Sequence, residues 1–109
     1  MLVYKVLRAQ EWSDFLTAGS TLGSPADLID GFVHLSTEEQ LAGTLKQHFG
    51  FETNLFLVAI DAGAVGAALN WEPSRSGHLY PHLYRPLLME DVIWCRPLDE
   101  SPVLPETQA

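Results

Sequence analysis

The chain has 109 residues, of which 47% are hydrophobic and 18% charged, and a formal net charge of −8. These values indicate one domain with a core of its own, and they argue against disorder and against a nucleic-acid partner, whose phosphates are bound mainly by Lys and Arg. A single cysteine, no signal-peptide pattern and no apolar run near the roughly 20 residues of a membrane helix favour a cytoplasmic protein.

The sequence of the N-terminal half predicts a strand, a helix, a loop and a second helix. Residues 2–7 form the strand. Residues 9–18 form the first helix, because Trp12, Phe15 and Leu16 recur on one helical face and Gly19 follows as a stop signal. Residues 20–29 are rich in Gly, Ser, Pro and Asp, which predicts a loop with one helical turn around residues 26–29. Residues 38–49 form the second helix.

Residues 30–40 connect this loop to the second helix and contain the first candidate site residues. Asp30-Gly31 predicts a turn, and residues 32–36 a short strand. Alternation places three side chains on one face of that strand: Phe32, His34 and Ser36. Ser36 or Thr37 then caps the helix, with Glu39 or Gln40 three positions later. A histidine and a hydroxyl next to free helix N–H groups suit a polar or anionic ligand.

The C-terminal half is rich in predicted strands. Residues 54–60 are an unbroken apolar run, which indicates a central strand covered on both faces. Residues 61–69 suit a turn or short irregular helix, and residues 71–74 a short strand. Residues 78–84 alternate strictly, and Pro81 predicts that this strand lies at an edge or a bulge. Residues 92–96 form the last strand.

With five or six strands and two early helices, the fold class is α+β. We expect a single domain over residues 1–97 and a flexible tail over residues 98–109, where prolines and acids accumulate. No feature of the sequence indicates an oligomeric state.

Candidate chemistry lies in His34 with Ser36, in Glu72, and in the ring-bearing face of residues 78–84: His78, Tyr80, His82 and Tyr84. Each also has a structural interpretation. A lone strand histidine is more often a hydrogen-bonded structural residue, Trp71 a core aromatic beside a solvated Glu72, and the tyrosines half-buried strand residues. No metal site is expected, since no His-x-His is present on a strand. Cys95 has no evident activating partner, and no glycine-rich phosphate loop occurs.

Several segments resemble the signatures of a small bacterial family of unassigned function, domain-of-unknown-function family 952. They are Gly31-Phe32-Val33-His34-Leu35-Ser36-Thr37, then Gln40, Trp71-Glu72 and Tyr80-Pro81-His82-Leu83-Tyr84. The likeness covers residues 3–97 in matching order. Two positions depart from it, since the family usually has Phe at Tyr80 and Gly at Arg85.

This resemblance implies an ADP-ribosyltransferase-like fold, a split antiparallel β-sheet that holds NAD in a cleft. Residues 33–36 and 57–62 also look like two strands of the NAD-dependent RNA 2′-phosphotransferases. Of their catalytic set only His34 is matched by motif. The first strand reads Val3-Tyr4-Lys5-Val6 and lacks the His-Gly or Arg of NAD-binding relatives.

The resemblance therefore implies a hypothesis for a site. Its catalytic residues are His34, Glu72 and His82, and its cofactor-binding residues are Tyr4, His34, Ser36, Tyr84 and Arg85. His34 and Ser36 bind a ribose hydroxyl or pyrophosphate oxygen, Tyr4 or Tyr84 stacks on a ring, and Arg85 offsets phosphate charge. Glu72 or His82 polarises a 2′-hydroxyl as nicotinamide leaves. The alternatives are a non-catalytic module that binds a small ligand in the same cleft, and a structural protein.

Overall fold

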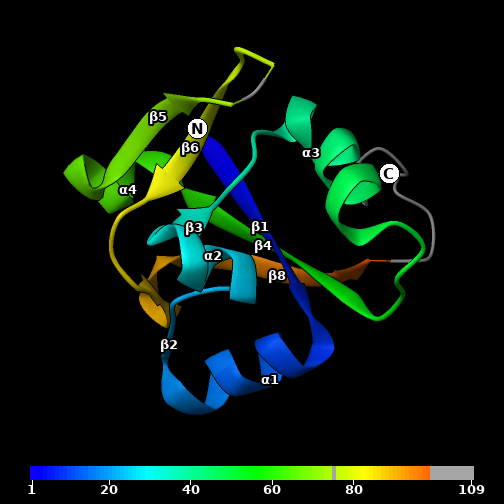
Figure 1. Ribbon diagram of the computed structural model, residues 1–109. Coiled ribbons are helices and arrows are strands. Elements are labelled where there is room, and N and C mark those ends of the chain that lie inside the picture. Colours follow the sequence, from blue (N-terminus) through cyan, green and yellow to red (C-terminus); the bar gives the residue numbers. More distant parts are fainter. Residues whose placement is uncertain (75, 99–109) are drawn as a thin grey trace.

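The computed structural model describes residues 1–74 and 76–98, and its largest element is an antiparallel sheet (Figure 1). The sheet has the strand order β1-β4-β8, with β1 at Leu2–Arg8, β4 at Leu55–Asp61 and β8 at Val92–Leu98. The unbroken apolar run of residues 54–60 is thus the central strand, as predicted. The sheet extends two residues beyond the predicted last strand, because Pro97 pairs with Phe56 and Leu98 with Leu55. The remainder of the predicted tail, residues 99–109, lies outside the described residues.

A second antiparallel sheet has the order β3-β6-β5, from Val33–His34, Leu79–Leu83 and Leu69–Pro73. The prediction that Pro81 places its strand at an edge is wrong, because β6 is central. The carbonyl of Pro81 accepts a hydrogen bond from Leu35 N, so the side of β6 that lacks an N–H is the side facing the short strand β3. A central position therefore costs little there.

Helices surround these sheets, and their predicted bounds agree with the structure in the N-terminal half. Helix α1 spans Ala9–Ala18 and ends at Gly19, whose φ is 79°. The helical turn predicted around residues 26–29 is the six-residue helix α2 (Pro25–Asp30), and the loop before it also contains a two-residue strand, β2 (Ser20–Thr21). The predicted second helix is divided into α3, Glu38–Thr44, and a π-helical turn, Leu45–Phe49.

The remaining elements are short. Helix α4 (Ala62–Val65) and a 3-10 turn (Gly66–Ala68) connect the two sheets, as predicted for residues 61–69. Strand β7 (Leu87–Leu88) pairs with β2, and a 3-10 turn (Met89–Asp91) leads into β8. Within the described residues, no helix has both the length and the apolar character needed to cross a membrane.

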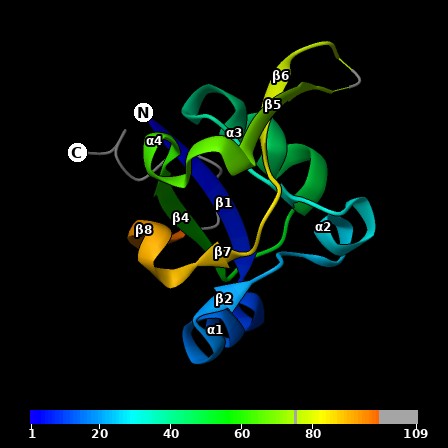
Figure 2. The same cartoon turned by 90° about the vertical axis from the view of Figure 1, so that its left-hand side faces the viewer.

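The core lies on both faces of the large sheet. One face packs against α1 and the small sheet, through buried residues that include Phe15, Val58 and Leu83. The other face packs against α3 and the π-helical turn, through Leu41, Leu45 and Leu57. Seen from the side, the β5–β6 hairpin projects beyond this body (Figure 2). Trp71, on β5, is 38% exposed, so the prediction of a core aromatic at this position is wrong.

Candidate functional site

The site begins where the two sheets meet. The chain after β3 returns to the large sheet, where Tyr4 and Ser36 exchange two backbone hydrogen bonds of 2.8 and 2.9 Å. Helix α3 then begins, with Thr37 as its cap and Gln40 closing the capping box, as the sequence predicted. The side chain of Gln40 also donates to the carbonyl of Leu79 at 2.7 Å. The small sheet is thereby fastened to both β1 and α3.

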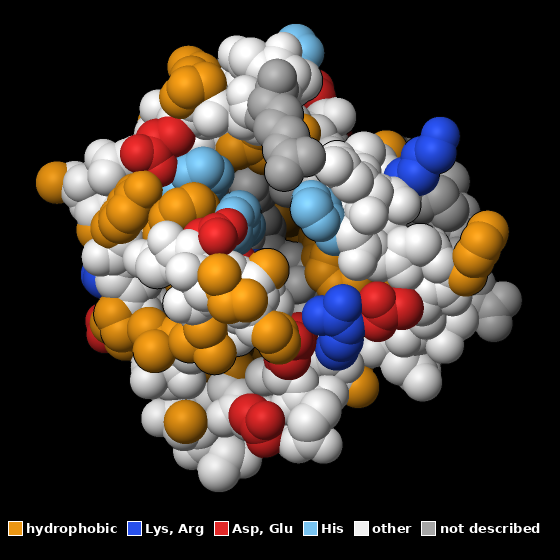
Figure 3. Space-filling model, in the orientation of Figure 1, with side chains coloured by type: hydrophobic (Ala, Val, Ile, Leu, Met, Phe, Trp, Pro, Cys, Tyr) orange, Lys and Arg blue, Asp and Glu red, His pale blue; other side chains and the backbone are white. Residues whose placement is uncertain are grey.

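His34 and His82 face each other across the β3–β6 pair. Their ring centroids are 5.3 Å apart in an edge-to-face arrangement. Phe32 contacts both rings, with centroids 4.5 Å from His34 and 4.1 Å from His82, and lies 5.2 Å from Tyr84. In Figure 3 two histidine side chains lie together over β3 and β6, beside a hollow between this region and α3. Four rings that the sequence placed on two separate strands are thus brought together.

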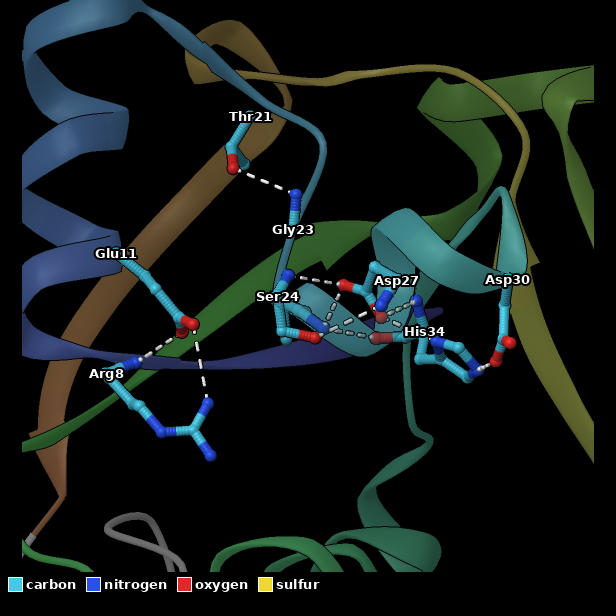
Figure 4. Close-up of polar contacts among 9 residues, drawn as sticks. Arg8, Glu11, Thr21, Gly23, Ser24, Asp27, Asp30 and His34 are labelled. Carbon is cyan, nitrogen blue, oxygen red and sulfur yellow. Dashed lines mark hydrogen bonds and ion pairs between the residues drawn. The ribbon is translucent and has the colours of Figure 1, made fainter.

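His34 is oriented by a carboxylate that sequence reasoning missed. Its Nδ1 lies 2.5 Å from Oδ1 of Asp27, and its backbone N–H donates to the same oxygen at 3.2 Å (Figure 4). The other oxygen of Asp27 accepts from Lys5 Nζ at 2.6 Å and from Ser24 N at 3.0 Å. On the opposite side of the ring, Nε2 of His34 lies 3.1 Å from Oδ2 of Asp30. The imidazole therefore stands between two carboxylates of one short helix.

Asp27 is ionised despite being only 2% exposed. Burial by itself would raise the pKa of Asp27, but the hydrogen bond from His34 and the charge and hydrogen bond of Lys5 outweigh it and hold the pKa at about 2. Gly23 allows the loop to pass close to this carboxylate, since a Cβ at that position would lie 1.9 Å from Oδ2. The signals for Asp27 in the sequence were Ser24-Pro25-Ala26-Asp27, a capping box with proline at the first helical position, and Lys5 in an otherwise apolar strand.

His82 is oriented by Glu72 of the neighbouring strand. Nδ1 of His82 lies 2.7 Å from Oε1 of Glu72, and the phenol of Tyr84 donates to the same oxygen at 2.7 Å. The hydrogen bonds from Tyr84 and from His82 lower the pKa of Glu72, and Glu72 in turn raises the pKa of Tyr84. The structure thus brings together His34, Glu72, His82 and Tyr84.

The other candidates have different surroundings. Tyr4 is 3% exposed and packs on Trp94 on the α3 side of the large sheet. Ser36 is also buried, and its Oγ lies 2.8 Å from Oγ1 of Thr44. Arg85 forms hydrogen bonds of 2.8 and 3.0 Å with Asp91, a pair that closes the turn before β8. Each of these three side chains therefore has a partner within the protein.

Nucleophilic and metal chemistry have little support in this region. Burial raises the pKa of the Cys95 thiol to about 11, so this residue is a thiol at neutral pH. The hydroxyl of Ser36 is committed to Thr44. Within residues 1–74 and 76–98, no group of three or more His, Cys, Asp or Glu side chains is arranged to hold a metal ion. What the site offers is hydrogen bonding and proton transfer by imidazoles.

An open groove of about 470 Å³ lies elsewhere, between α1, β2 and α2. Its lining includes Phe15, Leu22 and Leu28, together with Asp14 and Pro86. No residue of the histidine site lines this groove. We place the functional site at the histidines because the groove lacks a comparable set of oriented polar groups.

The fold and site define a small α+β domain that displays two carboxylate-supported histidines beside an aromatic ring. The chain belongs to the family described as "Protein of unknown function (DUF952)", whose model matches residues 6–95. This finding confirms the family predicted from the sequence segments.

Solved structures of a related protein share the fold. The crystal structure of protein CC0527 from Caulobacter crescentus is 44% identical, with a TM-score of 0.88, and the match covers 91% of this chain and 87% of that one. The solution NMR structure of CC0527 is 45% identical over 90% of this chain and 84% of that one, with a TM-score of 0.81. No curated protein matches the chain.

Proposed function

We propose that this chain binds a small polar molecule between the imidazoles of His34 and His82. The observation that carries the proposal is that Asp27 and Glu72 each hold one of these rings at Nδ1, while the rings lie 5.3 Å apart beside a surface hollow. A carboxylate at Nδ1 fixes the orientation of an imidazole and directs its Nε2 edge outward. Phe32 supplies a flat apolar surface at the same place, which suits a ligand with a ring or hydrocarbon part.

The chemistry that such a pair supports is general acid–base catalysis. Two oriented imidazoles can accept and return protons near neutral pH, and Tyr84 and Glu72 extend the hydrogen-bond network. Because neither Ser36 nor Cys95 is available as a nucleophile, proton transfer fits the site better than a covalent intermediate. Binding without turnover, as in a ligand-binding module, needs the same contacts.

A second candidate is NAD-dependent ADP-ribosyl transfer, which the family resemblance implies. The observation in its favour is Glu72, an ionised carboxylate held by two donors at the rim of the site. Such a group would stabilise the positive charge that develops on a ribose as nicotinamide leaves. Of the two tyrosines in that hypothesis, Tyr84 is accessible for stacking, whereas Tyr4 is buried.

The local charge favours the first candidate. Among the described residues, the cations nearest the site are already paired, Lys5 with Asp27 and Arg85 with Asp91. A pyrophosphate would thus find neither of these two cations unpaired. We propose that the partner is a small molecule, which would be NAD under the second candidate, and that nucleic acid is not bound.

The test is an NMR titration of the full chain with NAD, ADP-ribose and nicotinamide, with nicotinamide release from NAD assayed in parallel. The proposal predicts saturable shifts of the His34 and His82 ring signals, and His34→Ala should abolish the shift at His82, as His82→Ala should abolish that at His34. Release of nicotinamide that depends on Glu72 would favour the second candidate. If none of the three probes shifts either ring, the proposal is wrong for this class of ligand.

A further inference from the structure

The two histidines differ in how many carboxylates they face. Both ring nitrogens of His34 have a carboxylate oxygen within hydrogen-bond distance, Asp27 at 2.5 Å and Asp30 at 3.1 Å. A neutral imidazole carries a single N–H, so it can donate to only one of them. Since Asp27 is ionised, its oxygen accepts a hydrogen bond from the N–H at Nδ1. The approach of Asp30 Oδ2 to Nε2 at 3.1 Å is an ion-pair contact rather than a hydrogen bond, and a second proton, on Nε2, would make it attractive.

His82 has one such partner only. Its Nδ1 faces Glu72 at 2.7 Å, and its Nε2 has no hydrogen-bond partner among the described residues. With the proton on Nδ1, the lone pair of Nε2 remains as an acceptor. The pair can therefore present a donor at Nε2 of His34, where a proton would meet Asp30, and an acceptor at Nε2 of His82, with ring centroids 5.3 Å apart.

Asp30 makes the weaker of the two contacts to His34 and lies at the surface. Its side chain is 47% exposed, whereas that of Asp27 is 1% exposed. It is the last residue of α2, followed by Gly31 in the left-handed conformation. Exposed ion pairs contribute little, because water screens them and ordering the side chains costs entropy. A ligand oxygen that brings further contacts with it can therefore replace Asp30.

We propose that the carboxylate of Asp30 occupies the place of a ligand oxyanion, and that the site takes small molecules bearing a carboxylate or phosphate. The ligand oxygen accepts from Nε2–H of His34, and an adjacent hydroxyl or N–H of the ligand donates to Nε2 of His82. The inference rests on the proposed function and adds the class of ligand. It also makes Asp30 an internal competitor that limits affinity in the ligand-free chain.

The charges around His34 set the direction of the effect. The groups that face it are Asp27 and Asp30 from α2, Lys5 from β1 and His82 from β6, with Glu72 of β5 behind His82. Three carboxylates thus surround His34, with the ammonium of Lys5 beneath it. Removing the carboxylate of Asp30 lowers this negative charge and frees Nε2 of His34, and both changes favour an incoming anion.

The first test needs no ligand. Nitrogen NMR of the full chain at neutral pH reports which ring nitrogens carry protons. We expect both nitrogens of His34 to be protonated, and only Nδ1 of His82. In Asp30→Ala we expect the proton on Nε2 of His34 to exchange faster with water. Nδ1 should keep its proton, which is hydrogen-bonded to Asp27. An unprotonated Nε2 of His34 in the unaltered chain would overturn the inference and leave the proposed function standing.

The second test compares matched ligands that differ in charge. Nicotinate and nicotinamide form the carboxylate arm, and AMP and adenosine the phosphate arm, each titrated into the unaltered chain, Asp30→Ala and Asp30→Asn. The loss of the competing carboxylate of Asp30 should tighten binding of the oxyanion member by about tenfold in Asp30→Ala. The neutral member should change much less. Glu39→Gln, which removes an equal charge from α3, is the control and should change neither.

The outcomes separate the inference from the function on which it rests. A gain in Asp30→Ala confined to nicotinate identifies a carboxylate ligand, and one confined to AMP a phosphate ligand. If neutral members bind at His34 and His82 but neither oxyanion gains from the substitution, the inference is wrong and the binding site remains. If no member binds to any variant, both the inference and the proposed function fail for these ligands.

Discussion

In the large sheet the central strand β4 buries apolar side chains on both faces, among them Leu57 and Val58. In the small sheet the central strand β6 buries Pro81 and Leu83 on one face and turns His82 toward Glu72 on the other. The first arrangement uses five of the seven side chains of β4 for the core, whereas the second gives one face of β6 to polar groups that need partners. Such a face adds less to stability, so its histidines, carboxylates and exposed rings point to function.

Lys5 and Asp27 form the one place, within the described part of the chain, where a buried ion pair links the two regions. Lys5 belongs to the large sheet, and its ammonium reaches Asp27 beneath His34, where it also donates to the carbonyl of His34 at 3.1 Å. Removing two charges from water is costly, and a buried pair often stabilises no more than apolar residues of similar size. We therefore interpret this pair as a support for His34 rather than as a source of stability.

Breaking that pair should produce the largest effect. Asp27→Ala leaves the ammonium of Lys5 buried without its carboxylate, and we expect a loss of about 3–5 kcal/mol in the free energy of unfolding. Urea denaturation measures it. Replacing both charges, as in Lys5→Met with Asp27→Leu, should recover much of the loss while still disordering His34. If the double variant is as unstable as the single one, the pair stabilises the fold in its own right.

A substitution in the large sheet should lower stability without altering the site. Leu57 is fully buried in the α3-facing core, and Leu57→Ala should cost about 3 kcal/mol through lost contacts and a residual cavity. The ring signals of His34 and His82 should keep their positions under conditions where the variant is folded. Ile93→Ala on the exposed side of β8 is the matched control, with a change within about 0.5 kcal/mol. Large shifts of the histidine signals in Leu57→Ala would mean that the two regions are not separable.

Because Asp27 is ionised in the folded chain, the free energy of unfolding should depend on pH in the acid range. Its pKa is lowered from 3.8 to about 2 in the folded chain, so its contribution is fully present above about pH 4 and is lost as the pH falls toward 2. The lowered pKa corresponds to about 2 kcal/mol. Asp27→Asn should therefore flatten the acid limb of a stability profile measured by thermal unfolding. An equally steep limb in Asp27→Asn, matching that of the control Glu39→Gln, would contradict this assignment.

The local patterns predicted the parts of the fold that depend on neighbours in the chain. Helix α1 has its predicted bounds because an apolar stripe and Gly19 define both its face and its end. The ring-bearing face of β6 and its contact with His34 followed from alternation and the family resemblance. The capping box at Ser24 marks Asp27 as a residue at the start of a helix, but it does not show that Asp27 supports His34. Its importance comes from Lys5, twenty-two residues away, and from His34, seven residues away, and no local pattern reports such contacts.

The central position of β6 was missed for a related reason. The N–H that a proline lacks faces one neighbouring strand only, here the side of β3, and β3 ends at His34, before the position opposite Pro81. Strand length is set by where the chain leaves the sheet, and here Ser36 leaves to pair with Tyr4. The sequence showed that Pro81 removes a hydrogen-bond donor from β6, but it did not show that the neighbouring strand β3 is short enough to lack that bond.

The smallest expected effect concerns the outer edge of the site, where Glu72 joins His82 to Tyr84. The hydrogen bond to an ionised carboxylate keeps the phenol of Tyr84 protonated and raises its pKa. Glu72→Gln replaces that charge by a neutral acceptor, so Tyr84 should ionise at a lower pH, which a spectrophotometric titration of the tyrosines detects. Tyr84→Phe identifies which part of the titration belongs to this phenol. Because both groups are exposed, the stability of the fold should hardly change. An unchanged titration in Glu72→Gln would show that Tyr84 is held by something other than this carboxylate, and Glu72 would then orient His82 alone.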